Sequence, residues 1–115
     1  MGRSSNLTPL TEASYYVLIS LVEPLHGYGI MQKVDALTGG RVKIGPGTLY
    51  GALGNLESAG LIRRCGDAGA GDRRKAYVLT EMGRRVAESE VARLEAMVKH
   101  GRTLLNGGGV AGEDG

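Results

Sequence analysis

Apolar residues recur with helical spacing in four stretches of the chain, and shorter apolar runs lie between them. The four predicted helices lie at about residues 8–22, 27–38, 46–59 and 80–105. The runs LIRRC (61–65) and KAYVL (75–79) predict two short strands. The glycine-containing segment between them predicts the long tip of a hairpin. A further run, RVKI (41–44), is long enough only for a minor strand.

Start and stop signals support these helices. Thr8 is predicted to cap the first helix and Thr80 the last, because a threonine hydroxyl accepts from the free N–H groups of a first turn. The pair Gly39–Gly40 is predicted to end the second helix. The third helix is predicted to begin at Pro46 and to stop at Gly60.

The order of these elements predicts a mainly α fold with a small β-hairpin, in the arrangement of a winged helix-turn-helix. We assign the winged domain to residues 1–79, a long C-terminal helix to 80–105 and a flexible glycine-rich tail to 106–115. This organisation suits a chain of 115 residues with a single core.

The long C-terminal helix carries apolar residues alternately four and three positions apart, which is the spacing of a coiled-coil seam. A seam left over after the domain is covered implies a partner helix, so we expect a homodimer. Under three heptads are too few for an isolated coiled coil, and the first helix is expected to contribute. The predicted dimer interface comprises Val17, Leu21, Val91, Leu94, Val98 and Leu105.

Positive charge is concentrated in the middle of the chain. The whole sequence has a formal net charge of +2, whereas residues 41–75 hold seven basic and three acidic residues. A local basic excess on a nearly neutral chain favours a polyanionic partner over a plain solvated surface. Together with a helix-turn-helix, it predicts binding to double-stranded DNA.

Three glycines share one face of the third predicted helix. At about 100° per residue, Leu49, Ala52, Leu53 and Leu56 define the core side, and Gly47, Gly51 and Gly54 lie opposite. A glycine inside a helix costs about 1 kcal/mol relative to alanine. We interpret the bare face as one that approaches the DNA major groove closely. The alternative is compositional bias, since 20 of the 115 residues are glycine.

Polar and basic residues around that face are the other candidates for DNA contact. Tyr50 and Asn55 flank the glycines on either side, and Thr48 lies in the first turn. Asn55 could pair with adenine, or it could be a solvated surface residue. The predicted DNA-binding set is Arg41, Lys43, Gly47, Thr48, Tyr50, Gly51, Asn55 and, at the wing, Arg73, Arg74 and Lys75.

Signals for other functions are missing from the sequence. His26, His100 and Cys65 do not have metal-ligand spacing, and no catalytic constellation stands out. We therefore expect no enzyme activity, no cofactor and no metal. With one cysteine, no intrachain disulfide can form. The absence of a long apolar run and of a secretory signal predicts a cytoplasmic protein without a membrane anchor.

Several ordered motifs resemble the PadR family of bacterial transcriptional regulators. They are His26-Gly27-Tyr28, Gly45-Pro46-Gly47-Thr48-Leu49-Tyr50, Gly60-Leu61-Ile62 and Tyr77-Val78-Leu79-Thr80 with Gly83. The resemblance implies a homodimer that binds an inverted-repeat operator, usually as a repressor. It also implies the short subgroup, in which a single C-terminal helix follows the winged domain.

Two other readings stay open at this point. A winged-helix module could bind a protein instead of DNA, although such a module needs no basic wing. A small-molecule effector is also conceivable, but the long helix contains no aromatic residue for stacking, and we predict none.

Overall fold

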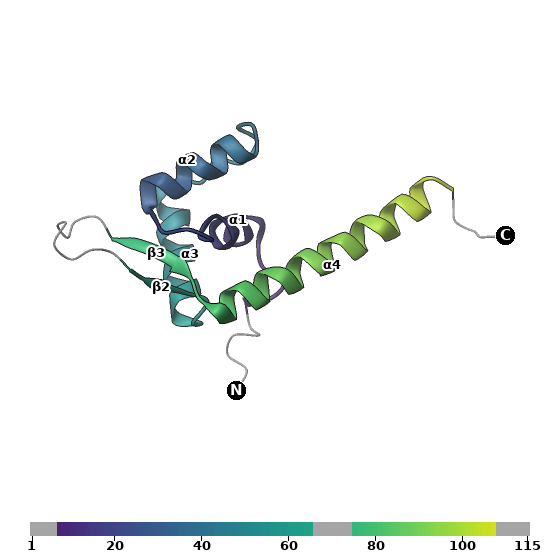
Figure 1. Ribbon diagram of the computed structural model, residues 1–115. Helices are drawn as coiled ribbons and strands as arrows, with labels where there is room; N and C mark the ends of the chain where they lie inside the picture. The colour runs from purple at the N-terminus through teal and green to yellow at the C-terminus, as the bar shows by residue number, and fades with distance from the viewer. Residues whose placement is uncertain (1–6, 66–74, 108–115) are drawn as a thin grey trace.

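The computed structural model describes residues 7–65 and 75–107. Figure 1 shows a small domain of helices and strands from which one long helix projects. The elements in chain order are α1 (Glu12–Ser20), β1 (Leu25–His26), α2 (Gly27–Leu37), α3 (Pro46–Ser58), β2 (Ile62–Arg64), β3 (Ala76–Leu79) and α4 (Glu81–Leu105). The predicted mainly α fold, with a winged helix-turn-helix and a long last helix, is confirmed.

The core forms where α3 packs against α1 and α2. The predicted apolar stripe of α3 is buried along its whole length, from Leu49 at 0% exposure to Leu56 at 0%. The same buried cluster contains Val17 and Leu18 of α1, Leu21 at the C-cap of α1, and Ile30 and Val34 of α2. Because α3 is anchored on one side only, its opposite side is left at the surface.

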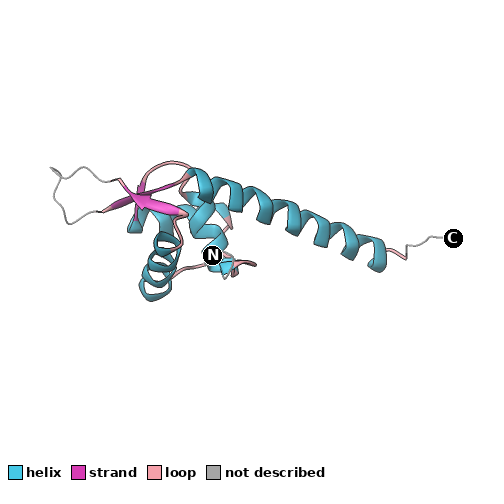
Figure 2. Cartoon of the chain, turned by 90° about the horizontal axis from the view of Figure 1, so that it is seen from below, coloured by secondary structure: helices cyan, strands magenta, loops and turns pink. Residues whose placement is uncertain are grey.

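The sheet has three antiparallel strands in the order β1-β3-β2. The predicted hairpin is confirmed, with Ile62 opposite Leu79 and Arg64 opposite Tyr77. Its tip, residues 66–74, lies outside the described residues. The third strand, β1, was not predicted; it pairs Leu25 with Tyr77 on the other edge of β3. Figure 2 shows the sheet at one end of the molecule and α4 extending the other way.

The predicted strand at 41–44 does not form. The N–H of Val42 donates to the Thr38 hydroxyl at 3.1 Å, which ties this segment to the end of α2 instead of to a strand. Gly39 and Gly40 end α2 with φ of +61° and +82°, as their sequence predicts.

The predicted cap of the first helix was wrong by one turn. Thr11, not Thr8, caps α1, and its Oγ1 accepts from the N–H of Ser14 at 3.1 Å. The cap of the last helix is confirmed, because Thr80 Oγ1 accepts from the N–H of Gly83 at 3.0 Å.

A buried carboxylate explains why the chain before α1 is held in place. Glu90 of α4 is 3% exposed, and its Oε1 accepts from the N–H of Leu10 at 3.1 Å. Arg93 donates to both carboxylate oxygens, from Nη2 at 2.8 Å and from Nε at 3.2 Å. Hydrogen bonding from Arg93, and then from Leu10, holds the pKa of Glu90 below its ordinary value against the opposing effect of burial.

We expect Glu90→Gln to remove a pH-dependent part of the stability. A native carboxyl with a lowered pKa binds fewer protons than the unfolded one, so its contribution is present above a pH of about 4.5 and fades as the pH falls through the native pKa. Urea unfolding at pH 7 should give the variant a free energy of unfolding about 1–2 kcal/mol lower than that of the wild type. At pH 3.5 the two free energies of unfolding should lie closer together. Glu95→Gln, at an exposed position of the same helix, is the matched control and should change the stability at pH 7 by less than about 0.5 kcal/mol. An equal loss of stability in Glu90→Gln at pH 7 and at pH 3.5 would contradict this account.

Candidate nucleic-acid interface

The outward face of α3 is open to solvent and free of neighbouring atoms. A Cβ added at Gly47, Gly51 or Gly54 would meet nothing within 4 Å. None of the three has a positive φ, so their backbone does not require glycine. The side chain that is missing from each position therefore leaves a smooth surface on which another molecule can come close to the helix backbone.

The first turn of α3 adds free backbone donors to this face. Gly45 is the N-cap and has no side chain to accept from the first turn, while Pro46 takes the first helical position. An uncapped helix N-terminus presents N–H groups and the positive end of the helix dipole, which favours an anion such as a phosphate.

Polar side chains frame the open face. Thr48 and Asn55 are exposed, and Tyr50 is 56% exposed. Tyr28, at the start of α2, is exposed as well, at 69%. The structure thus places donors, acceptors and the Tyr50 ring on α3 beside its bare surface, and the Tyr28 ring at the exposed start of α2. Such groups can contact base edges and the sugar-phosphate backbone.

The predicted basic residues are not equally available. Lys75 is exposed where β3 begins, and Arg63 and Arg64 are both exposed on β2. Arg64 faces Glu57 of α3, with 3.3 Å between Nε and Oε2. Arg73 and Arg74 lie outside the described residues. The predicted wing cluster is therefore represented in the structure by Lys75 at its edge.

Two predicted contacts are already paired with carboxylates. Arg41 Nη2 lies 2.6 Å from Glu12 Oε2, and Lys43 Nζ lies 2.9 Å from Asp35 Oδ1. The Glu12 carboxylate raises the pKa of Arg41. Both pairs are exposed, so water screens them and they contribute little to stability. Either cation would have to leave its partner to neutralise a phosphate.

Two of the residues predicted for the dimer interface are core residues. Val17 and Leu21 are 0% exposed within their own chain, so a partner cannot contact them in this fold. The α4 residues behave differently. Val91 is 36% exposed, Val98 52% and Leu105 88%, while Leu94 is half-buried.

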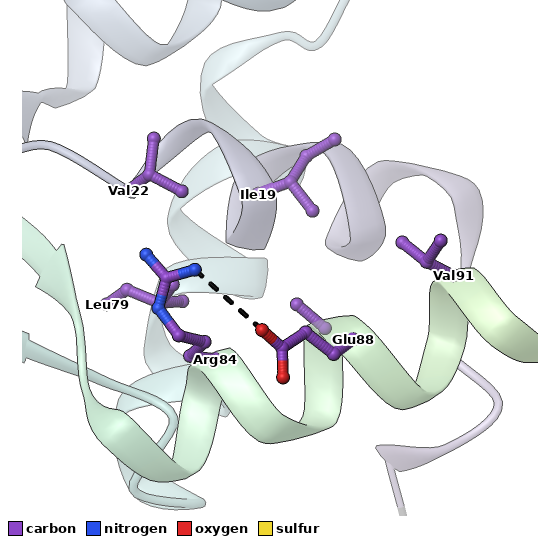
Figure 3. A pocket seen from close by; sticks show the side chains of 7 residues that line it. Ile19, Val22, Leu79, Arg84, Glu88 and Val91 are labelled. Atoms are coloured by element: carbon purple, nitrogen blue, oxygen red, sulfur yellow. Dashed lines mark ion pairs between the residues drawn. The ribbon is translucent and has the colours of Figure 1, made fainter.

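Near the end of α1, Ile19 and Val22, which lies just after the helix, face outward. They line a groove of about 270 Å³ together with Leu79, Ala87 and Val91. Figure 3 shows Ile19 and Val22 on one side of this groove and the α4 side chains on the other, with the Arg84–Glu88 ion pair of 3.9 Å at its rim. Ile19 and Val22 were not predicted, because the predicted interface took Val17 and Leu21 from the stripe that packs in the core, and Ile19 and Val22 lie off that stripe.

The described residues contain no helix that is long and apolar enough to cross a lipid bilayer. Within 7–65 and 75–107, no group of histidine, cysteine or acidic side chains is placed to hold a metal ion.

Comparison with known proteins gives a consistent result. Residues 16–89 match the model of the transcriptional regulator PadR-like family. A PadR family transcriptional regulator from Eggerthella lenta is 30% identical, with a TM-score of 0.70 over 83% of this chain and 82% of that one. A transcriptional regulator from Clostridium thermocellum is 24% identical and shares the fold, with a TM-score of 0.67 over 76% of this chain and 84% of that one.

A curated relative is much longer than this chain. An uncharacterized 37.1 kDa protein in transposon TN4556 of Streptomyces fradiae is 40% identical over 91 residues, which are 76% of this chain. The chain spans about a quarter of the length of that relative.

Proposed function

Because this chain belongs to the PadR-like family of transcriptional regulators, we propose that it represses transcription as a homodimer bound to an inverted-repeat operator. The family is one of transcriptional regulators, which are not enzymes. DNA binding by this chain, the repressor role, the dimer, the operator type and a cytoplasmic location are our proposals.

One observation carries the proposed mode of DNA binding. The face of α3 opposite its buried stripe is open at Gly47, Gly51 and Gly54, and polar side chains surround it. The major groove of B-form DNA is wide enough for a helix. A helix without side chains on one face can sit deeper in that groove than an ordinary one. Thr48, Tyr50 and Asn55 then reach base edges and phosphates on either side.

Dimerisation supplies the second half of the interface. One chain offers one α3, and two half-sites about 34 Å apart need two recognition helices in a fixed relation. The outer half of α4 exposes Met97 (54%), Val98 (52%) and Leu105 (88%). We propose that this ridge packs against α4 of a second copy. We also propose that Ile19 and Val22, which line the groove, contribute to the dimer interface where Val17 and Leu21 had been predicted to do so.

Val98→Arg should convert the dimer to a monomer. Val98 is half-exposed in the single chain, so the fold should survive, whereas a dry dimer seam would bury two unpaired charges at a cost of several kcal/mol. Sedimentation equilibrium should show the mass of one chain. Ala96→Arg, exposed on the other side of α4, is the matched control and should stay dimeric. A Val98→Arg protein that remains a dimer would place the interface elsewhere.

DNA binding should depend steeply on salt. If the two subunits together neutralise about six phosphates, log affinity falls against log salt with a slope of about −5. A double variant, with Arg73→Ala and Arg74→Ala, should bind all DNA sequences more weakly to the same degree. Its slope should be flatter by about 2 to 4. Arg85→Ala, on α4 beside Glu81, should leave the slope unchanged. Binding of a protein partner but of no DNA, at any salt concentration, would favour the protein-interaction alternative.

A further inference from the structure

A space at the start of α2 is filled by a side chain from α3. Gly27, the first residue of α2, is buried, and a Cβ there would lie 2.5 Å from Tyr50 Oη and 3.1 Å from Tyr50 Cζ. It would also lie 3.3 Å from Leu49 Cδ2, a contact that a shift of a few tenths of an ångström relieves. The Tyr50 ring therefore occupies the place where any other residue at position 27 would have its side chain.

The backbone does not explain why position 27 is glycine. Gly27 is not among the glycines with positive φ, which in the described residues are Gly39, Gly40, Gly60 and Gly107. Nor does helix formation favour it, because glycine is a poor helix former. What the glycine provides is room for the end of the Tyr50 side chain.

Without that room, the ring would have to lie elsewhere on α3. Residues three and four positions away are its neighbours on a helix surface, and for Tyr50 these include Gly47 and Gly54. Both are open, with nothing within 4 Å of an added Cβ. A ring displaced from α2 would thus have free space over the bare face itself.

We infer that Gly27 is a positioning residue for DNA recognition: the side chain it lacks lets Tyr50 lie against the start of α2, which keeps the ring off the bare face of α3. The inference rests on the proposed function, because it concerns the surface that enters the groove. Gly27 itself need not touch DNA, and it acts through Tyr50.

Gly27→Ala tests this role, and Gly29→Ala is its matched control. A Cβ at Gly29, two residues further along α2, would lie 3.5 Å from Leu25 Cδ2, an ordinary contact. Both variants should melt at or above the wild-type temperature, because alanine is a better helix former than glycine. The Tyr50 atoms that a Cβ at position 27 would displace are the end of a flexible side chain, which can move at little cost. Gly27→Ala should bind operator about 10-fold more weakly, and Gly29→Ala should bind as the wild type does.

A double-mutant cycle assigns the effect to the ring. In a Tyr50→Ala background, Gly27→Ala should not change operator affinity, because no ring remains to be displaced. An equal loss in both backgrounds, or no loss in the wild-type background, would overturn the inference.

A measurement without DNA separates this inference from the proposed function. The Tyr50 ring resonances, assigned by NMR, should shift in Gly27→Ala and not in Gly29→Ala. If they shift and the wild type binds no DNA, the positioning of the ring stands and the proposed function fails. If the resonances do not move, the inference about Gly27 fails whatever the protein binds.

Discussion

Gly51→Leu should leave the fold intact and lower operator affinity by about 100-fold or more. Gly51 is exposed in the middle of the bare face, and a Cβ there meets nothing within 4 Å, so the isolated chain accommodates leucine. Leucine is also the better helix former, by up to about 1 kcal/mol. In the complex, the added side chain would hold α3 away from the groove floor in both half-sites. Losing one or two good base contacts costs about 3 kcal/mol, which is the expected factor of 100.

The comparison with Gly51→Ala makes this result specific. Alanine adds one methyl group, so it should raise helix stability by a similar amount and reduce affinity far less than leucine does. Thermal melting reports the fold, and fluorescence anisotropy of labelled operator reports the affinity. Should Gly51→Leu bind as tightly as the wild type, the glycines of α3 would be a product of composition and not of close approach.

Gly83→Ala is expected to destabilise the fold strongly, because Gly83 has the tightest surroundings among the described glycines. A Cβ at Gly83 would overlap the carbonyl oxygen of Leu61 and lie 2.9 Å from its carbonyl carbon. These are backbone atoms, which a rotamer change cannot move. The same carbonyl accepts from the N–H of Thr80 at 3.0 Å, and the Thr80 hydroxyl donates to Gly60 O at 2.7 Å. Alanine would force the first turn of α4 away from the domain and break these two hydrogen bonds, which join α4 to the chain at Gly60 and Leu61.

Overpacking of this kind costs about 3 kcal/mol when the neighbour cannot yield. For a domain of this size, that loss lowers the melting temperature by about 10 °C or more. Gly101→Ala, on the same helix with nothing within 4 Å of its added Cβ, should instead be neutral or stabilising. A Gly83→Ala protein with the melting temperature of the wild type would mean that the start of α4 is not held against Gly60 and Leu61.

Helix α3 is the element that the sequence predicts best. Leu49, Leu53 and Leu56 repeat with helical period, and Gly45-Pro46 and Gly60 mark its ends, so local pattern alone predicts both its bounds and its open face. The outer side of α1 was harder to predict, because Tyr15 and Ile19 of the helix and Val22 just after it make that side apolar as well.

Contacts between distant parts of the chain could not be predicted from local sequence patterns. The two-residue strand β1 exists because β3 offers it a free edge, and two residues cannot show a period. Thr8 and Thr11 are both competent caps, and the structure selects Thr11. The roles of Gly27 and Gly83 depend on Tyr50 and Leu61, which only the folded chain brings beside them.

Methylation protection is the measurement that tests groove entry by α3 most directly. Dimethyl sulfate attacks N7 of guanine in the major groove and N3 of adenine in the minor groove. On a bound fragment taken from the protein's own promoter region, we expect guanines to be protected in two inverted half-sites centred about 34 Å, or a multiple of it, apart. Gly51→Leu should lose that protection. Protection confined to adenine N3, with every guanine N7 in the bound site still reactive, would contradict groove entry by the glycine face.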